Sequence, residues 1–242
     1  MKPWITLASA LAPGGSTMTL VRRDDTFVIR VDKQELMSNR MHDSEVALAS
    51  LTCEGLGPKA RVLVGGLGMG FTLRTALDKL GPHARVDVAE FVPEIVDWNR
   101  GVLAHLAKRP LEDKRVRVLV ADVMRVIAEA PATYDAILLD VDNGPMALSA
   151  PGNANLYGEP ALLRSKAALT PGGVFAVWSA GHSRVFHQRL ENVGFDVSVR
   201  HVFAHGDSGP RFVIWIARPV TPRAPKNARA PLPSARGRGR LR

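Results

Sequence analysis

The sequence predicts an α/β fold built on one mostly parallel sheet, and three observations indicate it. Short apolar segments alternate with helical segments from about residue 61 to residue 179. These strand-like segments carry apolar residues on both faces, which is typical of parallel strands covered by helices on both sides. Two further segments, 195–203 and 212–217, flank a polar turn and are expected to pair as an antiparallel hairpin. We therefore expect a Rossmann-like, seven-stranded sheet with five parallel strands and a terminal antiparallel hairpin.

The elements follow in order along the chain. Two short strands around Asp24-Asp25 predict an N-terminal β-hairpin, and a helix is expected from Asp43 or Ser44 to about Cys53. The hairpin strands are Thr17–Arg23 and Thr26–Val31; the main strands are Arg61–Val64, Arg85–Ala89, Val116–Ala121, Tyr134–Asp140 and Gly173–Ser179; the helices between them are Thr72–Leu80, Glu94–Leu106, Val123–Ala130 and Glu159–Leu169. We expect an N-terminal region over residues 1–57, a nucleoside-binding catalytic domain over 58–218 and a tail over 219–242. Five parallel strands closed by an antiparallel pair form the sheet of the class I S-adenosylmethionine-dependent methyltransferases.

Composition limits the class of protein. A chain of 242 residues with 46% hydrophobic residues can bury the core of one sizeable α/β domain. No apolar run reaches the roughly 20 residues that cross a bilayer. The segment Met1 to Gly15 has a weakly charged start and no convincing cleavage site, so we expect no signal peptide and a cytoplasmic protein without membrane contact. The single Cys53 excludes an internal disulfide and fits a reducing compartment.

The net charge of +9 comes mostly from the C-terminal tail. Pro219 to Arg242 carries seven basic residues and no acidic residue, so the rest of the chain is near neutral. The tail has few apolar side chains and is expected to be disordered. It would offer weak contact to nucleic acid through long-range charge attraction, or serve only as a solubilising extension.

A glycine-rich turn between strand and helix carries the strongest functional signal. Gly66, Gly68 and Gly70 follow the apolar run at 61–65, and Glu90 ends the next strand, twenty residues beyond Gly70. Glycines permit positive φ and a close approach of the backbone to a ligand, and an acid at this spacing accepts hydrogen bonds from ribose hydroxyls. No lysine followed by Ser or Thr closes the turn, so a triphosphate-binding P-loop is not expected. We interpret these residues as a nucleoside site.

Further carboxylates follow neighbouring strands of the expected sheet. Asp122 (with Val123), Asp140 and Asp142 come after apolar strands, as Glu90 does. The carboxyl ends of parallel strands meet at one edge, where ligands bind, so these acids are expected to face a polar or cationic ligand. Taken singly, Asp122 could instead cap the helix that follows it. Asp140 could hold an amine, accept its proton or orient it for attack. His201 and His205 lack a third ligand at metal-binding spacing, so no metal site is expected.

In these residues the chain resembles the spermidine/spermine synthase family, from about Arg22 to Ala217. Gly66-Leu-Gly-Met-Gly-Phe71 before Thr72-Leu-Arg74 is similar to the glycine motif of the family. The resemblance implies that Glu90 holds the ribose, that Asp122 lies near the adenine, and that Asp140 is the catalytic aspartate with Asp142 as amine anchor. Leu156-Tyr157-Gly-Glu159 resembles the segment that follows in the family.

The chain also departs from the family pattern. Met69 stands where the family has an aspartate that faces the amine end of decarboxylated S-adenosylmethionine. Asp140-Val-Asp142 is one residue shorter than the Asp-Ser-Ser-Asp of the family. With Val31-Asp32 as anchor, Leu36 and Glu45 replace a glutamine and a tyrosine that help to grip the polyamine.

Three functions follow from this comparison. The first is an aminopropyltransferase that moves the three-carbon amine of decarboxylated S-adenosylmethionine to a small-molecule amine such as putrescine, as a monomer or a homodimer. The second, motivated by Met69, is a methyltransferase that uses intact S-adenosylmethionine. The third is a non-catalytic nucleoside-binding module.

Overall fold

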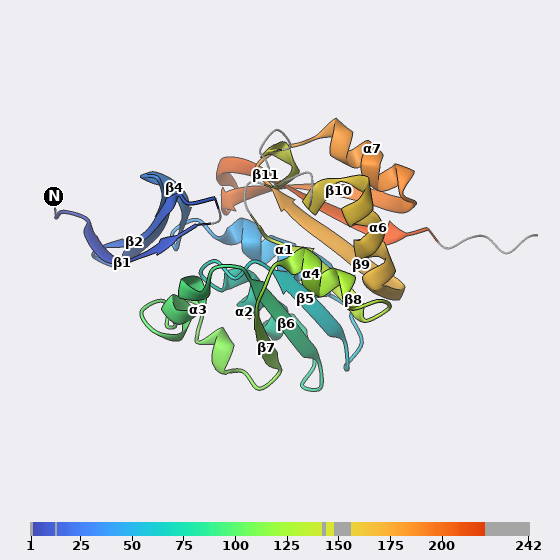
Figure 1. The fold of residues 1–242 in the computed structure, drawn as a ribbon, viewed down its shortest axis with the longest axis horizontal. Coiled ribbons are helices and arrows are strands. Elements are labelled where there is room, and N and C mark those ends of the chain that lie inside the picture. Colours follow the sequence, from blue (N-terminus) through green and yellow to red (C-terminus); the bar gives the residue numbers. More distant parts are fainter. Residues whose placement is uncertain (1, 13, 142–143, 148–155, 221–242) are drawn as a thin grey trace, which may run out of the picture.

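The computed structural model describes residues 2–12, 14–141, 144–147 and 156–220 and contains two β-sheets (Figure 1). The first sheet has the order β1-β2-β3-β4, with every neighbouring pair antiparallel. Its strands are β1 (Ile5–Leu11), β2 (Thr17–Arg23), β3 (Thr26–Val31) and β4 (Gln34–Ser38). The predicted hairpin is its central pair, β2 and β3.

Predicting only a hairpin in the N-terminal region was incomplete. The two outer strands β1 and β4 were missed because most of their residues are exposed. Ile5 and Leu11 are 60% and 71% exposed, so the outer strands lack the alternation of buried and exposed residues that marks a half-buried strand.

The second sheet has seven strands in the order β10-β11-β9-β8-β5-β6-β7. Strands β5 to β9 pair in parallel, and β11 pairs antiparallel with both β9 and β10. The bounds are β5 (Arg61–Gly65), β6 (Arg85–Glu90), β7 (Val116–Val120), β8 (Tyr134–Leu139), β9 (Leu169–Ser179), β10 (Phe195–His205) and β11 (Ser208–Pro219). The predicted seven-stranded α/β sheet is confirmed.

Helices cover both faces of this sheet (Figure 1). On one face, α1 (Asp43–Cys53), α2 (Phe71–Lys79) and α3 (Pro93–Arg100) share a core with the sheet. On the other, α4 (Val123–Ala128), α6 (Glu159–Ala168) and α7 (Arg184–Asn192) do the same. Two short 3-10 turns, η1 (Pro110–Glu112) and η2 (Gly144–Ala147), complete the described part. The helix predicted to reach Leu106 ends at Arg100, because Gly101 adopts ψ −110° and leaves the helical region.

The two sheets meet at the edge where β5 and β6 end. The N-terminal sheet lies beside this edge, near α3, and α1 packs on β8, β9, β10 and β11 (Figure 1). The boundary at residue 57 stays a prediction, since α1 packs on the large sheet.

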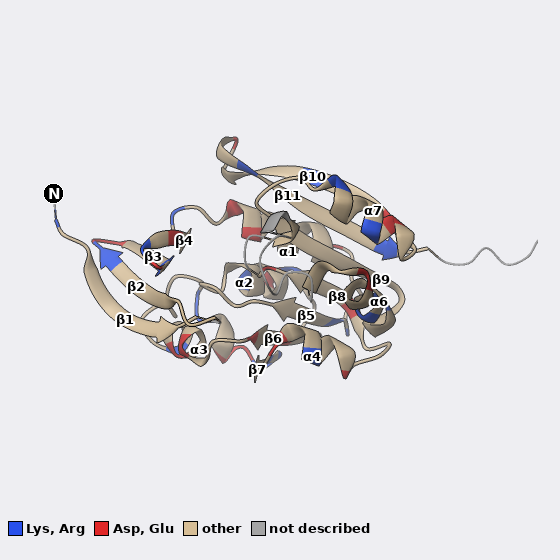
Figure 2. Ribbon diagram, turned by 45° about the horizontal axis from the view of Figure 1, so that its top comes forward, with Lys and Arg blue, Asp and Glu red and all other residues tan. Residues whose placement is uncertain are grey.

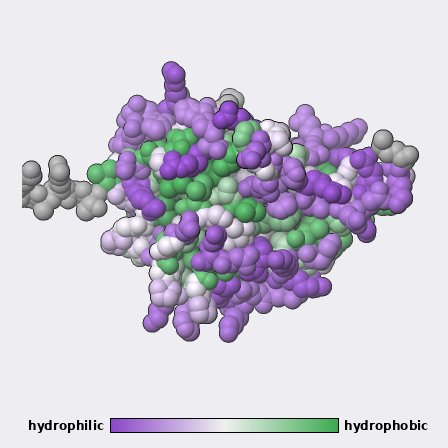
Figure 3. Space-filling view, turned by 180° about the vertical axis from the view of Figure 1, so that it is seen from behind, coloured by the Kyte–Doolittle hydropathy of each residue, from purple (hydrophilic) through white to green (hydrophobic). Residues whose placement is uncertain are grey.

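The surface of the described part carries both signs of charge. Figure 2 shows lysine, arginine and acidic residues interspersed over the ribbon. Seen from behind, an apolar area lies in the region of α1 and the neighbouring strands, bordered by polar side chains (Figure 3). None of the helices in the described ranges is long and apolar enough to cross a bilayer.

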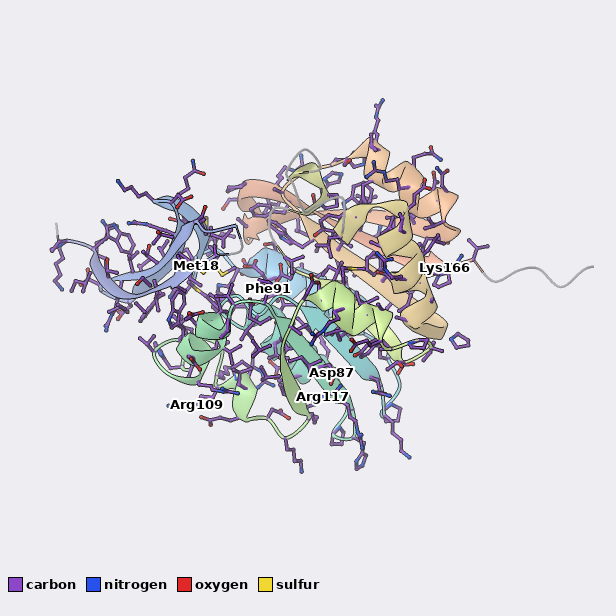
Figure 4. All side chains as sticks on the ribbon, viewed as in Figure 1. Met18, Asp87, Phe91, Arg109, Arg117 and Lys166 are labelled. Carbon is purple, nitrogen blue, oxygen red and sulfur yellow. The ribbon has the colours of Figure 1, made fainter. Side chains whose placement is uncertain are left out.

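A buried carboxylate cross-links three strands toward the β7 edge of the large sheet. Asp87 on β6 accepts hydrogen bonds from Nε and Nη2 of Arg117 on β7, each at 2.8 Å, and from the hydroxyl of Tyr134 on β8 at 2.9 Å. Figure 4 shows Asp87 and Arg117 side by side on the ribbon. Burial and the bond to Asp87 raise the pKa of Tyr134 above its usual range. The network is fully hydrogen-bonded, so it stabilises the register of the strands that carry the site.

We expect Asp87→Ala to lower the free energy of unfolding by about 2–4 kcal/mol, because it leaves the Tyr134 hydroxyl without its buried acceptor and removes a charged pair. Chemical denaturation measures the change. Asp97→Ala is the control, since its pair with Arg100 spans 3.8 Å between side chains more than half exposed. Asp97→Ala should lower the free energy of unfolding by less than about 1 kcal/mol. An equal loss of unfolding free energy in the two variants would contradict a stabilising role for the network.

Candidate active site

The glycine turn between β5 and α2 has the backbone conformation that the sequence predicts. Gly66, Gly68 and Gly70 have φ of +90°, +51° and +85°, in the left-handed region that side chains disfavour. The amide of Gly66 donates to the carbonyl of Ala89 at the end of β6, at 2.8 Å. The turn is therefore held against the next strand.

The turn is also closely packed by its neighbours. A Cβ on Gly66 would lie 2.2 Å from the carbonyl oxygen of Asp140, and one on Gly68 would lie 2.8 Å from Cε of Met37 on β4. Asn99 on α3 donates from Nδ2 to the carbonyl of Gly68 at 2.8 Å. The N-terminal sheet, α3 and the end of β8 thus converge on the turn.

Glu90 ends β6 beside this turn. It is 9% exposed, and its two carboxylate oxygens accept from the amides of Leu67 and Val92, each at 2.9 Å. Burial raises the pKa of Glu90, while the backbone amides oppose that rise. The carboxylate is fixed in place between the turn and the start of α3, next to any ligand that lies on the turn.

Asp140 follows β8 directly, and its amide continues the sheet by donating to the carbonyl of Gly65 at 2.8 Å. Its Oδ2 accepts from the hydroxyl of Thr72, which is buried at the start of α2. Burial, and then the charge of Glu45, raise the pKa of Asp140 to about 7; the bond from Thr72 opposes the rise. A carboxylate with a pKa near neutrality is matched to accepting a proton at physiological pH.

Glu45 is a second carboxylate near Asp140, contributed by the first turn of α1. Its Oε2 accepts from the hydroxyl of Ser44 at 2.6 Å. Burial is the main reason that the pKa of Glu45 is raised, with the charge of Asp43 adding to it. Two carboxylates that repel each other in a partly buried site favour a cationic ligand, which relieves the repulsion.

The remaining predicted site residues lie nearby. Asp122 follows β7, and its Oδ1 accepts from the amide of Met124 at 2.7 Å, so it caps α4 as the alternative interpretation held. It remains exposed, and the preceding residue, Ala121, donates to the carbonyl of Glu90. Val123 is 8% exposed and packs on Gly65. The acids Glu90, Asp122 and Asp140 therefore lie at one edge of the sheet, while Asp142 lies outside the described residues.

Other polar groups in the described ranges do not add a metal centre. No group of three or more His, Cys, Asp or Glu side chains in these ranges is arranged to hold a metal ion. A cavity of about 660 Å³ next to Arg115 and one of about 410 Å³ next to His105 lie elsewhere, and none of the predicted site residues lines them.

Comparison with known proteins identifies the family. A family model described as the spermine/spermidine synthase domain matches residues 44–206. The chain belongs to the spermine/spermidine synthase family. This is a family of aminopropyltransferases. No curated protein sequence matches the chain.

Solved structures of spermidine synthases share the fold. The chain is similar to the spermidine synthase from Thermotoga maritima, with TM-score 0.72 and 17% identity over 88% of this chain and 72% of that one. A spermidine synthase in complex with the transition state analogue AdoDATO gives TM-score 0.70 and 16% identity, with the same coverage of 88% and 72%. A probable spermidine synthase from Corynebacterium glutamicum ATCC 13032 gives 0.61 and 19% over 90% of this chain and 81% of that one.

The departure from the family pattern in the glycine turn has a structural consequence. Met69, at the position of the family's aspartate, is 3% exposed and belongs to the hydrophobic core. Its thioether side chain carries no charge, so position 69 supplies no anion to the glycine turn.

Several residues of the site were missed in the sequence. Asn99 and Met37 contact the glycine turn only through tertiary structure, so no local pattern marks them. Thr72 is part of the glycine motif, but its bond to Asp140 was not predicted. Phe91 could have been found, because it follows Glu90 directly in the chain. Its ring is 56% exposed, near the end of β6 and toward the N-terminal sheet (Figure 4).

Proposed function

We propose that this protein transfers an aminopropyl group from decarboxylated S-adenosylmethionine to a small amine such as putrescine. Family membership supports this proposal, and the observation that carries it is Asp140: desolvation raises the pKa of its carboxylate to about 7, and its backbone carbonyl approaches the glycine turn. In the donor, the three-carbon amine chain is attached to a positively charged sulfur, which is a good leaving group.

The donor would lie along the glycine turn. Its ribose hydroxyls would donate to Glu90, and the exposed ring of Phe91 would cover one face of the adenine, with Asp122 and Val123 at the next strand end. The positive charge of the donor would offset the negative charge of the carboxylates in the site, so no lysine or arginine is needed there for charge balance.

The transfer step then needs only alignment and one proton acceptor. The nitrogen lone pair of the acceptor forms a bond to the carbon beside sulfur, the C–S bond breaks, and its electron pair stays on sulfur as a neutral thioether. The proton lost by the nitrogen goes to the carboxylate of Asp140. The hydroxyl of Thr72 holds the carboxylate of Asp140 in place, and this carboxylate orients the acceptor nitrogen for in-line attack.

Calorimetric titration with decarboxylated and intact S-adenosylmethionine tests the donor, and incubation with putrescine followed by product analysis tests the transfer. We expect binding of the decarboxylated donor and formation of spermidine. Binding of only the intact donor, without spermidine, would favour the alternative methyltransferase, which the neutral Met69 motivates.

Glu90→Gln should weaken the binding of either donor by roughly 10- to 100-fold, because it replaces charged hydrogen bonds with neutral ones and places an amide N–H against a backbone N–H. Calorimetry measures the change. Glu112→Gln, an exposed position in η1, is the matched control and should leave affinity unchanged. Unchanged affinity in Glu90→Gln would remove Glu90 from the donor site.

The cellular setting and the assembly belong to the same proposal. We propose a cytoplasmic enzyme acting on a small molecule, either as a monomer or as a homodimer. The basic tail, which lies outside the described residues except at its start, would add weak contact with nucleic acid. Deleting residues 221–242 should then flatten the salt dependence of RNA binding.

A further inference from the structure

The cavity of about 410 Å³ next to His105 lies between the N-terminal sheet and the turn that follows α3. Figure 1 shows that sheet beside α3. The volume is within the range of small-molecule sites, about 300–1,000 Å³, and such sites often lie where two parts of a fold meet. None of the residues that line this cavity takes part in the proposed transfer.

The wall from the N-terminal sheet is held by hydrogen bonds. Asn39, just after β4, accepts from the amide of Phe27 through Oδ1 at 2.8 Å and donates from Nδ2 to the carbonyl of Asp25 at 3.0 Å. The amide of Asn39 donates to the carbonyl of Phe27 at 3.2 Å. These three bonds fix the turn between β2 and β3, which carries Asp25 into the wall of the cavity.

The opposite wall is largely apolar. The amide of Leu106 donates to the carbonyl of Leu103 at 2.9 Å, which holds the turn after α3. Leu106 is partly buried against the core, whereas Val102 is 39% exposed. The ring of His105 meets the ring of Phe27 edge-on, with centroids 5.6 Å apart, so the two walls are in contact beside the cavity.

Two opposite charges line this cavity without pairing with each other. No nitrogen of Arg22 lies within 4.0 Å of a carboxylate oxygen of Asp25. Arg22 donates from Nε to the carbonyl of Asp24 at 2.6 Å, and its guanidinium lies 5.3 Å from the ring centroid of Phe27. Its Nη groups have no acceptor, and the carboxylate of Asp25 has no donor, among the described residues.

This combination of charges selects the kind of ligand. A ligand with only one charge would pair with either Arg22 or Asp25 and would bring a like charge close to the other, which is unfavourable. A zwitterion can pair with both. An apolar part of the ligand would remove the exposed surface of Val102 from water, which adds to the affinity.

We propose that this cavity binds a free α-amino acid with an apolar side chain. The carboxylate of the ligand pairs with the Nη groups of Arg22, its ammonium pairs with the carboxylate of Asp25, and its side chain lies against Val102 and Leu106. A guanidinium can hold a carboxylate through two parallel hydrogen bonds, which gives this end of the ligand a defined orientation.

Calorimetry of the full chain with leucine and three analogues tests this proposal. The first analogue, 4-methylpentanoate, lacks the ammonium, and the second, 3-methylbutylamine, lacks the carboxylate; both keep the apolar body of leucine. We expect leucine to bind with a Kd of about 1 mM or tighter, and each of these analogues to bind about 3- to 30-fold more weakly. Glycine, which lacks the apolar body, should bind at least about tenfold more weakly.

Substitutions in the wall assign each charge to its partner. Arg22→Gln and Asp25→Asn should each weaken leucine by about 3- to 30-fold. Arg22→Gln should also remove the difference between leucine and 3-methylbutylamine, and Asp25→Asn the difference between leucine and 4-methylpentanoate. Lys33→Gln and Asp24→Asn are the matched controls, because both positions are exposed on the same sheet and outside the cavity. They should leave the affinity for leucine unchanged.

The outcomes decide the proposal independently of aminopropyl transfer. Loss of leucine binding in both cavity variants, with binding retained in both controls, supports it. No binding of leucine up to about 10 mM, an unchanged affinity in Arg22→Gln or Asp25→Asn, or an equal loss in the controls overturns it. Equal affinity for leucine and either singly charged analogue overturns it as well, because one of the two charges would then contribute nothing.

Discussion

Asp140→Asn should lower the rate of aminopropyl transfer by about 10²- to 10⁴-fold, the usual contribution of a positioned proton acceptor. The amide can still accept from Thr72, so the fold around the site should persist while proton acceptance is lost. In the wild-type enzyme, kcat/KM for the acceptor should rise with pH through a limb at about 7 or lower, since a bound sulfonium favours the carboxylate. The variant should lack this limb. Steady-state kinetics across pH 5–9 measure both quantities.

The same substitution should stabilise the protein at neutral and higher pH. The pKa of Asp140 is raised from 3.8 to about 7 in the folded protein, so between these values the folded state holds a proton that the unfolded state has lost. The free energy of unfolding therefore falls as pH rises from about 4 to about 7. Asn carries no charge, so at pH 8 the variant should be more stable by about 2–4 kcal/mol, at roughly 1.4 kcal/mol per pKa unit.

Thermal melts of the wild-type protein and of Asp140→Asn at pH 5 and pH 8 test this expected stabilisation separately from activity. A gain in stability that is larger at pH 8 than at pH 5 supports the buried, neutralised carboxylate. Equal melting temperatures at pH 8 would mean that Asp140 is well solvated, and its role as a base of raised pKa would be wrong.

Gly66→Ala should have the largest effect on the fold near the site. Its Cβ would lie 2.2 Å from the carbonyl oxygen of Asp140, which is backbone and cannot rotate away, and φ is +90°. We expect a loss of at least about 3 kcal/mol in the free energy of unfolding, together with loss of donor binding. Denaturant titration and calorimetry measure the two effects.

Gly55→Ala provides the matched control for backbone strain. Gly55 also has a positive φ, +79°, but nothing lies within 4 Å of its Cβ position. The Gly55→Ala variant should lose only about 1–2 kcal/mol in the free energy of unfolding. The difference between the two variants isolates the close approach of the glycine turn to β8, and a difference near zero would contradict that approach.

Much of the fold could be predicted from local patterns. The inner parallel strands are largely apolar because both of their faces are buried, and hydrophobic patterning alone marks such strands. The edge strand β7 is only partly buried, but its valine and leucine residues still mark it as a strand. The left-handed conformations at Gly66, Gly68 and Gly70 follow from glycine's freedom at φ above zero. The outer strands β1 and β4 could not be found, because exposed residues at the edge of a small sheet leave no periodic signal.

The candidate site also has one part that the sequence predicts and another that depends on tertiary structure. The sequence by itself determined which acids end the strands, since Glu90, Asp122 and Asp140 each follow a strand-like run rich in apolar residues. Only the tertiary structure decided what these acids meet: Thr72 and Glu45 approach Asp140 because α1 and α2 pack on the same face of β8. The pKa of Asp140 is set by burial and by a neighbour 95 residues away in the chain, and no local pattern encodes such long-range contacts.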